Sequence, residues 1–140
     1  MVEDRAQEKR YTYGDYRLWD DDLHWELSDG AAFCLSSLSG GMSPGPGATH
    51  QTLLWDLFFS LKNYFQGKTC RVYVAPFDVL LPDDDESEDE IDTVVQPDIM
   101  ILCDKSRLHS YGIKGAPDVV FEILSPSTAR RDLTAKLRLY

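Results

Sequence analysis

The chain has 140 residues, of which 43% are hydrophobic and 27% are charged, and its formal net charge is −10. This length suits one compact domain, so we expect residues 1–140 to fold around a single core. No apolar run approaches the roughly 20 residues that a membrane helix needs, and the first ten residues lack the apolar stretch of a secretion signal. The sequence therefore argues against a membrane protein and favours a cytoplasmic one.

The negative charge is concentrated between Asp83 and Asp92, where eight acidic residues occur without a basic one. Outside this segment 16 acidic residues face 14 basic ones, so most of the chain is nearly neutral and contacts with phosphate groups remain feasible. The run has neither the ligand spacing nor the turn glycine of a calcium-binding loop. We expect residues 82–92 to form a mobile, solvated loop outside any active site.

The three cysteines, Cys34, Cys70 and Cys103, are far apart and show no paired spacing. This arrangement suggests neither a zinc site nor a disulfide framework. We expect three small, buried thiols in a reducing compartment.

The first elements in chain order are a short helix and a hairpin. Thr12 and Asp15 resemble a helix-capping pair, which predicts a helix that ends near residues 20–22. Strand-like runs then flank Ser28-Asp29-Gly30, a turn signal that predicts a β-hairpin. The Ser-, Gly- and Pro-rich stretch 36–48 predicts a flexible surface loop.

A second helix is predicted from Thr49, its expected cap, to Gly67, because leucines and phenylalanines recur there at helical spacing. Apolar or β-branched runs predict strands at residues 71–75, 77–81, 99–102 and 119–124, the last of them central in the sheet, and a final helix is expected from residues 125–127 through Tyr140. This order predicts an α/β or α+β fold in which helices flank a mixed sheet.

Two carboxylates stand out as candidates for chemistry. Asp98 follows Pro97 at the start of an apolar strand, and Glu122 interrupts the apolar run 119–124. A carboxylate in a buried strand is costly unless it is paired, hydrogen-bonded or bound to a metal. Glu122 is therefore a site candidate, although a partly exposed position beside an Arg or Lys would also explain it.

Lys136 is the candidate cation. On a helical projection it lies about 60° from the apolar stripe of the last predicted helix, which points it toward the interior. It can reach toward Glu122 from that position, or it can form an i,i+4 pair with Asp132.

Six segments together resemble the bacterial Uma family of putative restriction endonucleases. They span nearly the whole chain and read YTYGDYRLW, HWELSDG, SPGPGATHQTLLWDL, VVQPDIMILCD, GAPDVVFEILSPST and RRDLTAKLRLY. The resemblance implies a restriction-endonuclease-like fold of the PD-(D/E)XK type. Because relatives continue beyond the position that matches Tyr140, it also implies that the C-terminal part of the fold is truncated here.

The resemblance also implies site residues. In PD-(D/E)XK nucleases an Asp and a Glu hold magnesium while a Lys polarises the attacking water, and these roles fall on Asp98, Glu122 and Lys136. The orthodox lysine position is occupied by Leu124, and the family lysine on the next helix matches Lys136. Glu26 matches a family glutamate and is an accessory catalytic candidate or a structural residue of the hairpin. His50 also matches the family pattern, with a capping or packing role as the simpler reading.

These observations predict a hydrolase: a Mg²⁺-dependent endonuclease, with Mn²⁺ as the alternative metal, that cuts DNA and acts as a homodimer. A nuclease-fold binding or assembly module without catalysis is the rival, and the acidic segment favours it. On the nuclease reading, Lys136→Ala should abolish cleavage and leave fold and metal affinity nearly unchanged.

Overall fold

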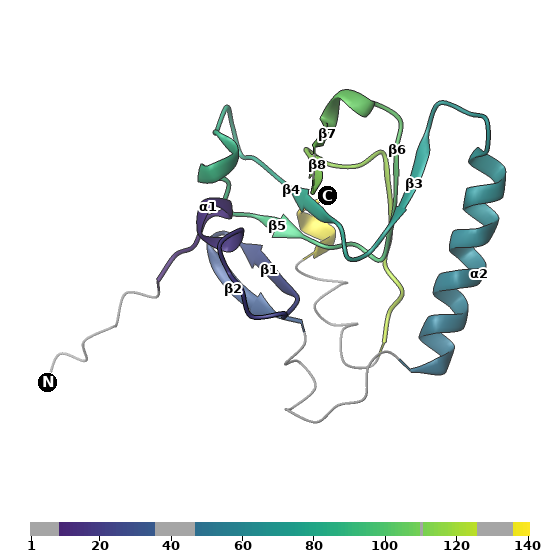
Figure 1. The fold of residues 1–140 in the computed structure, drawn as a ribbon, viewed down its shortest axis with the longest axis horizontal. Coiled ribbons are helices and arrows are strands. Elements are labelled where there is room, and N and C mark those ends of the chain that lie inside the picture. Colours follow the sequence, from purple (N-terminus) through teal and green to yellow (C-terminus); the bar gives the residue numbers. More distant parts are fainter. Residues whose placement is uncertain (1–8, 36–46, 110, 126–135) are drawn as a thin grey trace, which may run out of the picture.

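The computed structural model describes residues 9–35, 47–109, 111–125 and 136–140. This part contains two sheets and two α-helices (Figure 1). The helices are α1 (Tyr13–Tyr16) and α2 (Ala48–Phe65), with 3₁₀ turns η1 (Glu88–Glu90), η2 (Lys105–Arg107) and η3 (Lys136–Arg138). The strands are β1 (Trp25–Ser28), β2 (Ala31–Cys34), β3 (Arg71–Val74), β4 (Asp78–Leu80), β5 (Val94–Val95), β6 (Ile99–Leu102), β7 (Leu108–His109), β8 (Gly112–Lys114) and β9 (Val119–Phe121).

The larger sheet has six strands in the order β2-β1-β5-β4-β8-β7. β4 and β8 are parallel and the other neighbours are antiparallel, so the sheet is mixed. Its centre is fully buried, because Val79 and Leu80 of β4 and both residues of β5 are removed from solvent. The expected mixed α+β architecture is therefore confirmed.

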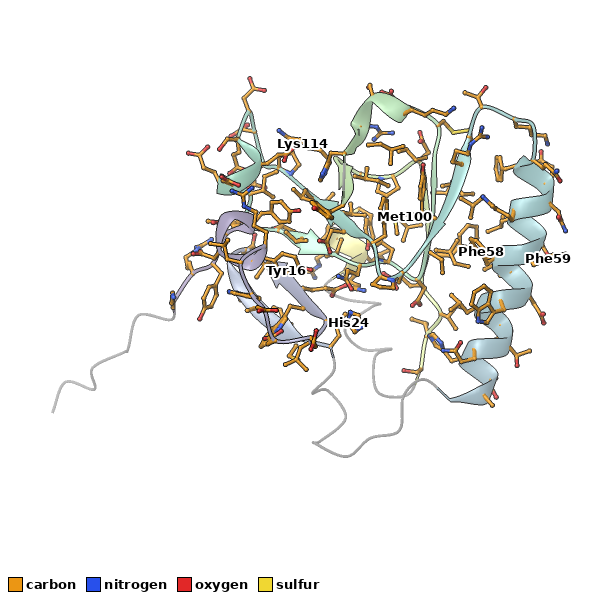
Figure 2. All side chains as sticks on the ribbon, viewed as in Figure 1. Tyr16, His24, Phe58, Phe59, Met100 and Lys114 are labelled. Atoms are coloured by element: carbon orange, nitrogen blue, oxygen red, sulfur yellow. A yellow bond between two sulfur atoms is a disulfide. The ribbon has the colours of Figure 1, made fainter. Side chains whose placement is uncertain are left out.

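The smaller sheet has the order β3-β6-β9, with antiparallel pairing throughout. All four residues of the central strand β6 are buried. Helix α2 covers this sheet and packs Leu54, Phe58 and neighbouring apolar side chains against Val72, Ile99 and Ile101. Figure 2 shows Phe58 pointing toward the strands and Phe59 pointing away from them, as the helical period requires.

The local sequence signals for α1 and the hairpin are confirmed. The backbone N–H of Thr12 donates to Asp15 Oδ2 at 3.0 Å, which closes the start of α1, although the helix ends at Tyr16, before residues 20–22. In the hairpin turn, Asp29 and Gly30 both have positive φ, 48° and 77°. An Asp-Gly pair accommodates this conformation at low steric cost, so β1 and β2 pair as the predicted antiparallel hairpin.

Two expectations about the strands and helices need correction. β9 ends at Phe121 and lies at the edge of the described three-stranded sheet, so Glu122 follows an edge strand and does not interrupt a central one. Helix α2 begins at Ala48 with Gly47 as its N-cap, so Thr49 lies inside the first turn. The predicted loop at 36–48 and final helix at 125–140 fall largely outside the described residues.

The cysteine prediction is also wrong. Cys70 and Cys103 form a disulfide, and Cys34 is half-buried. The β3–β6 register explains the pairing: Arg71 lies opposite Leu102, and one step further along the two strands Cys70 lies opposite Cys103.

The acidic segment joins β4 to β5, as expected, but it is not simply a solvated loop. It contains η1, and Ile91 within it is completely buried in the core with Tyr13 and Leu27. Two of its carboxylates form exposed ion pairs, Asp89 with Arg17 at 3.1 Å and Asp92 with Arg10 at 2.9 Å. The segment thus anchors α1 to the larger sheet.

Gly112 allows β8 to approach β4 closely, which gives a first prediction. A Cβ at this position would overlap the backbone carbonyl of Asp78, with which Gly112 is paired. Gly112→Ala should therefore lower the free energy of unfolding by about 3 kcal/mol, as overpacking does when backbone must move. Urea unfolding followed by tryptophan fluorescence measures this, and Gly47→Ala is the matched control because a Cβ there meets nothing within 4 Å. Equal stability of the two variants would contradict the prediction.

Candidate active site

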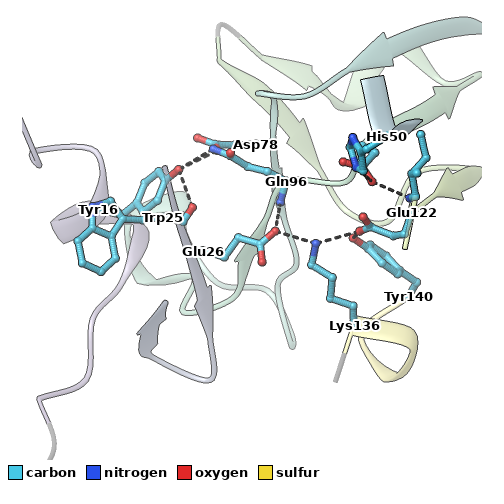
Figure 3. Close-up of polar contacts among 11 residues, drawn as sticks. Tyr16, Trp25, Glu26, His50, Asp78, Gln96, Glu122, Lys136 and Tyr140 are labelled. Atoms are coloured by element: carbon cyan, nitrogen blue, oxygen red, sulfur yellow. Dashed lines mark hydrogen bonds and ion pairs between the residues drawn. The ribbon is translucent and has the colours of Figure 1, made fainter. Parts of the chain in front are cut away.

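The candidate site lies where the two sheets meet. The chain leaves β5 of the larger sheet, passes through Gln96, Pro97 and Asp98, and enters β6 of the smaller sheet. Side chains from β1, from the end of β9, from η3 and from the first turn of α2 gather around this crossing (Figure 3). The fold thereby brings residues from both ends of the sequence to one place.

Asp98 and Glu122 lie on neighbouring strand ends. β6 and β9 are antiparallel and Ile99 lies opposite Phe121, so the same register, continued by one residue, places Asp98 opposite Glu122. Two contacts fix Asp98: its Oδ2 accepts from the Ile123 N–H at 2.6 Å, and its carbonyl accepts from the Ala75 N–H at 3.0 Å. Residues directly opposite each other in an antiparallel pair share a face, as a common cation site requires.

Lys136 lies between two carboxylates. Its Nζ is 3.0 Å from Glu26 Oε1 and 3.0 Å from Glu122 Oε1, and the side chains of Lys136 and Glu26 are only 7% and 1% exposed. The Tyr140 hydroxyl also donates to Glu122 Oε1, at 3.3 Å. The structure therefore brings together Lys136, Glu26 and Glu122, while Asp132 lies outside the described residues.

The charge of Lys136 is stabilised by these partners. Burial alone would lower the pKa of Lys136, but the Coulombic attraction of Glu26 and Glu122 and their hydrogen bonds outweigh it and raise the pKa above its ordinary value. The ammonium thus stays protonated in an interior position. A buried cation with two carboxylate partners is a pattern of functional sites and also of structural ion pairs.

Glu26 connects this ion pair to a second polar cluster. Its Oε1 also accepts from the Gln96 backbone N–H at 2.8 Å. The Gln96 side chain donates to Asp78 Oδ1 at 2.8 Å and to the Tyr16 hydroxyl at 3.1 Å, and Tyr16 donates to the same Asp78 oxygen at 2.9 Å. Figure 3 shows this continuous path of contacts from Tyr16 to Glu122.

Burial affects both ionisable members of the second cluster. It raises the pKa of Asp78, while the hydrogen bonds from Gln96 and Tyr16 oppose this shift. Burial, together with the nearby Asp78 carboxylate, raises the pKa of Tyr16 as well. Sequence reasoning missed Tyr16, Asp78 and Gln96, although Asp78 interrupts an apolar run just as Glu122 does.

His50 lies in the first turn of α2 beside Asp98. Its Nε2 is 3.8 Å from Asp98 Oδ2, beyond hydrogen-bond distance, and its buried Nδ1 has no hydrogen-bond partner in the described part of the chain. His50 therefore lies at the edge of the site and does not cap α2, whose N-cap is Gly47.

The donor set suits a hard divalent cation. Asp98 and Glu122 supply carboxylate oxygens, the ligands that Mg²⁺ prefers, and Mg²⁺ is commonly held by one or two carboxylates together with water and substrate phosphate. Within residues 9–35, 47–109, 111–125 and 136–140, no group of three His, Cys, Asp or Glu side chains forms a ready-made metal cage. Two carboxylates are a number of protein ligands that is common for Mg²⁺.

The Lys136 ion pairs give a second prediction. Removing the ammonium leaves two carboxylates without their cation, so Lys136→Met should cost about 3–5 kcal/mol of unfolding free energy at pH 7, and Lys136→Ala should not be structurally silent. The pKa of Lys136 is raised in the fold, so its contribution is complete below about pH 10.5, the ordinary lysine value, and is lost as the pH rises through the folded-state pKa.

The measurement is urea unfolding from pH 7 to 11.5 in the presence of EDTA. The stability difference between wild type and Lys136→Met should narrow at the alkaline end. Glu122→Gln leaves the contact between Lys136 and Glu26 in place. It should therefore lower the free energy of unfolding by less than Lys136→Met does. A difference that stays constant to pH 11.5 would contradict the ion-pair account.

Comparison with known proteins gives the family and the fold of this chain. The model of the Uma2 family, described as putative restriction endonucleases, matches residues 13–140. The fold is similar to the crystal structure of a putative nuclease belonging to DUF820 from Anabaena variabilis, with a TM-score of 0.62 and 18% identity. That match covers 91% of this chain and 65% of the solved chain, so this chain spans less than two thirds of its length.

Two negative findings follow, one from a search and one from the structure. A search of curated proteins found no match. No helix in the described residues is both long enough and apolar enough to span a membrane. Since the family model covers nearly the whole sequence, the chain belongs to the Uma2 family of putative restriction endonucleases.

Proposed function

We propose that this protein is a magnesium-dependent endonuclease that hydrolyses DNA phosphodiester bonds. The observation that carries the proposal is the buried Lys136 ammonium, held 3.0 Å from Glu122 at the end of the strand pair that also presents Asp98. Membership of the Uma2 family supports a nuclease, and DNA is the substrate class that fits it. Asp98, Glu122, Lys136 and Glu26 are the proposed site residues.

The proposed roles follow from the contacts. Asp98 and Glu122 would hold the cation, with Mn²⁺ as an alternative to Mg²⁺. A bound Mg²⁺ supplies a Lewis acid that lowers the pKa of water and neutralises charge on the scissile phosphate. Lys136 contributes a fixed positive charge close to Glu122, where it orients the attacking water and stabilises the charge that develops on phosphate oxygens.

Glu26 has a supporting role in this proposal. It is fully buried and contacts Lys136 on the side away from Glu122, so it holds the ammonium in position and keeps it charged. A preorganised charge costs no rearrangement at the moment of reaction, which is the main source of electrostatic catalysis. We also propose a homodimer, since paired sites can cut both strands of a duplex in one binding event.

The third prediction tests the proposed function with a plasmid-nicking assay in Mg²⁺ or Mn²⁺. Asp98→Asn keeps an oxygen that can accept from the Ile123 N–H but removes the negative charge, so the variant should fold normally and lose nicking by at least about 100-fold. Its Mn²⁺ affinity, measured by electron paramagnetic resonance, should fall in parallel. EDTA should abolish nicking by the wild-type protein.

Asp56→Asn is the matched control, because Asp56 is an exposed residue of α2 and should leave nicking unchanged. If folded wild-type protein does not nick DNA at any concentration of either metal, the nuclease proposal fails. The same result would favour the rival, a nuclease-fold binding module without catalysis. The local excess of acid at residues 83–92, which repels phosphate, is the observation on its side.

A further inference from the structure

We propose that Gln96 is a positioning residue whose side chain, held by Asp78 and Tyr16, fixes the backbone N–H that holds Glu26 and, through Glu26, the Lys136 ammonium. This inference rests on the proposed nuclease function for its catalytic consequence. The contacts themselves do not depend on that function, so the two can be tested separately.

The first step is that both ends of Gln96 are tied to different strands of the larger sheet. Its backbone N–H donates to Glu26 of β1, and its side-chain amide donates to Asp78 of β4. β5, which directly precedes Gln96, is paired with both β1 and β4. A change at the amide end is therefore transmitted to the N–H end over a single residue.

The second step is that the amide end is closely defined. Gln96, Asp78 and Tyr16 form a closed triangle of three hydrogen bonds of 2.8 to 3.1 Å. The side chain of Gln96 has three rotatable bonds, and such a triangle selects one of its rotamers. Pro97 follows, and its side chain is fully buried. Because a proline ring restricts the backbone of the residue before it, the conformation of Gln96 is also limited from this side.

The third step concerns the free-energy cost of burying the Asp78 carboxylate. Burial disfavours the ionised form of Asp78, so a carboxylate at this position does not improve stability as an apolar residue would. Its contacts instead give the Gln96 amide a charged acceptor, and charge-assisted hydrogen bonds are about twice as strong as neutral ones. The cluster thus gives the Gln96 side chain a defined geometry next to the candidate site.

The experiment exchanges the side-chain amide of Gln96 and the carboxylate of Asp78 between the two positions. Gln96→Glu places a second carboxylate beside Asp78 and should lower kcat for plasmid nicking by about 10- to 100-fold, as small misplacements of catalytic groups do. KM should change by less than about threefold, because on this proposal Gln96 does not contact the DNA. The double variant Asp78→Asn with Gln96→Glu restores an amide–carboxylate pair and should recover most of the lost kcat.

A readout without catalysis separates this inference from the proposed function. In the wild-type protein the residue-96 amide proton, bonded to a buried carboxylate, should resonate downfield and exchange slowly by NMR. In Gln96→Glu we expect its exchange to be at least about tenfold faster, and in the double variant slow again. Gln66→Met, an exposed glutamine at the end of α2, should change neither kcat nor this amide.

Each outcome of these experiments supports or contradicts the inference. Recovery of both kcat and amide protection in the double variant supports positioning. If Gln96→Glu is folded and keeps wild-type protection of the residue-96 amide, or if a folded double variant recovers neither quantity, the inference is wrong. If the wild-type protein does not nick DNA, the proposed function fails, and the amide data alone decide whether Gln96 positions Glu26.

Discussion

The contact of Lys136 with Glu26 and Glu122 joins three separate segments of the chain at the junction of the two sheets. Glu26 belongs to β1 of the larger sheet, Glu122 follows β9 of the smaller sheet, and Lys136 begins the last described turn. The two sheets share a buried apolar cluster, in which Val79, Val95 and Ile113 of the larger sheet pack with Met100 and Leu102 of the smaller one. The ion pair adds to this packing a directionality that apolar contacts lack.

The same junction explains why polar groups collect in the interior. The chain crosses from β5 to β6 within three residues, and two antiparallel strand ends meet there. Backbone groups at strand ends lack ladder partners and must be satisfied by side chains. Asp98 does this for Ile123 and Glu26 does it for Gln96, so carboxylates that suit a metal site also complete the hydrogen bonding of the fold.

Much of the fold could be predicted because its signals are local. The Asp-Gly turn, the capping pair of α1 and the helical period of α2 each occupy a few consecutive residues. The errors arose where pairing over long distances decides the outcome: the disulfide depends on the β3–β6 register, and the edge position of β9 depends on sheet order. Neither can be read from spacing along the chain.

The candidate site shows the same difference between local signals and contacts over long sequence distances. Glu122 was identified because an acid in an apolar run is costly, although the strand proved to be an edge strand. The same argument applies to Asp78 in its apolar run, and that signal went unused. Gln96 had no comparable signal, since its role depends on two hydrogen bonds that leave from opposite ends of one residue. The contact of Glu26 with Lys136 spans most of the sequence and required the structure.

β1 is buried on both of its faces, so a change in packing on one face affects the other. Leu27 packs in the core with Tyr13 and Ile91, while its neighbour Glu26 points to the opposite face and contacts Lys136. Any repacking around Leu27 that shifts the strand also shifts the Glu26 carboxylate, because the two residues are adjacent in β1. Apolar substitutions in this core can therefore alter the environment of the Lys136 ammonium without contacting it.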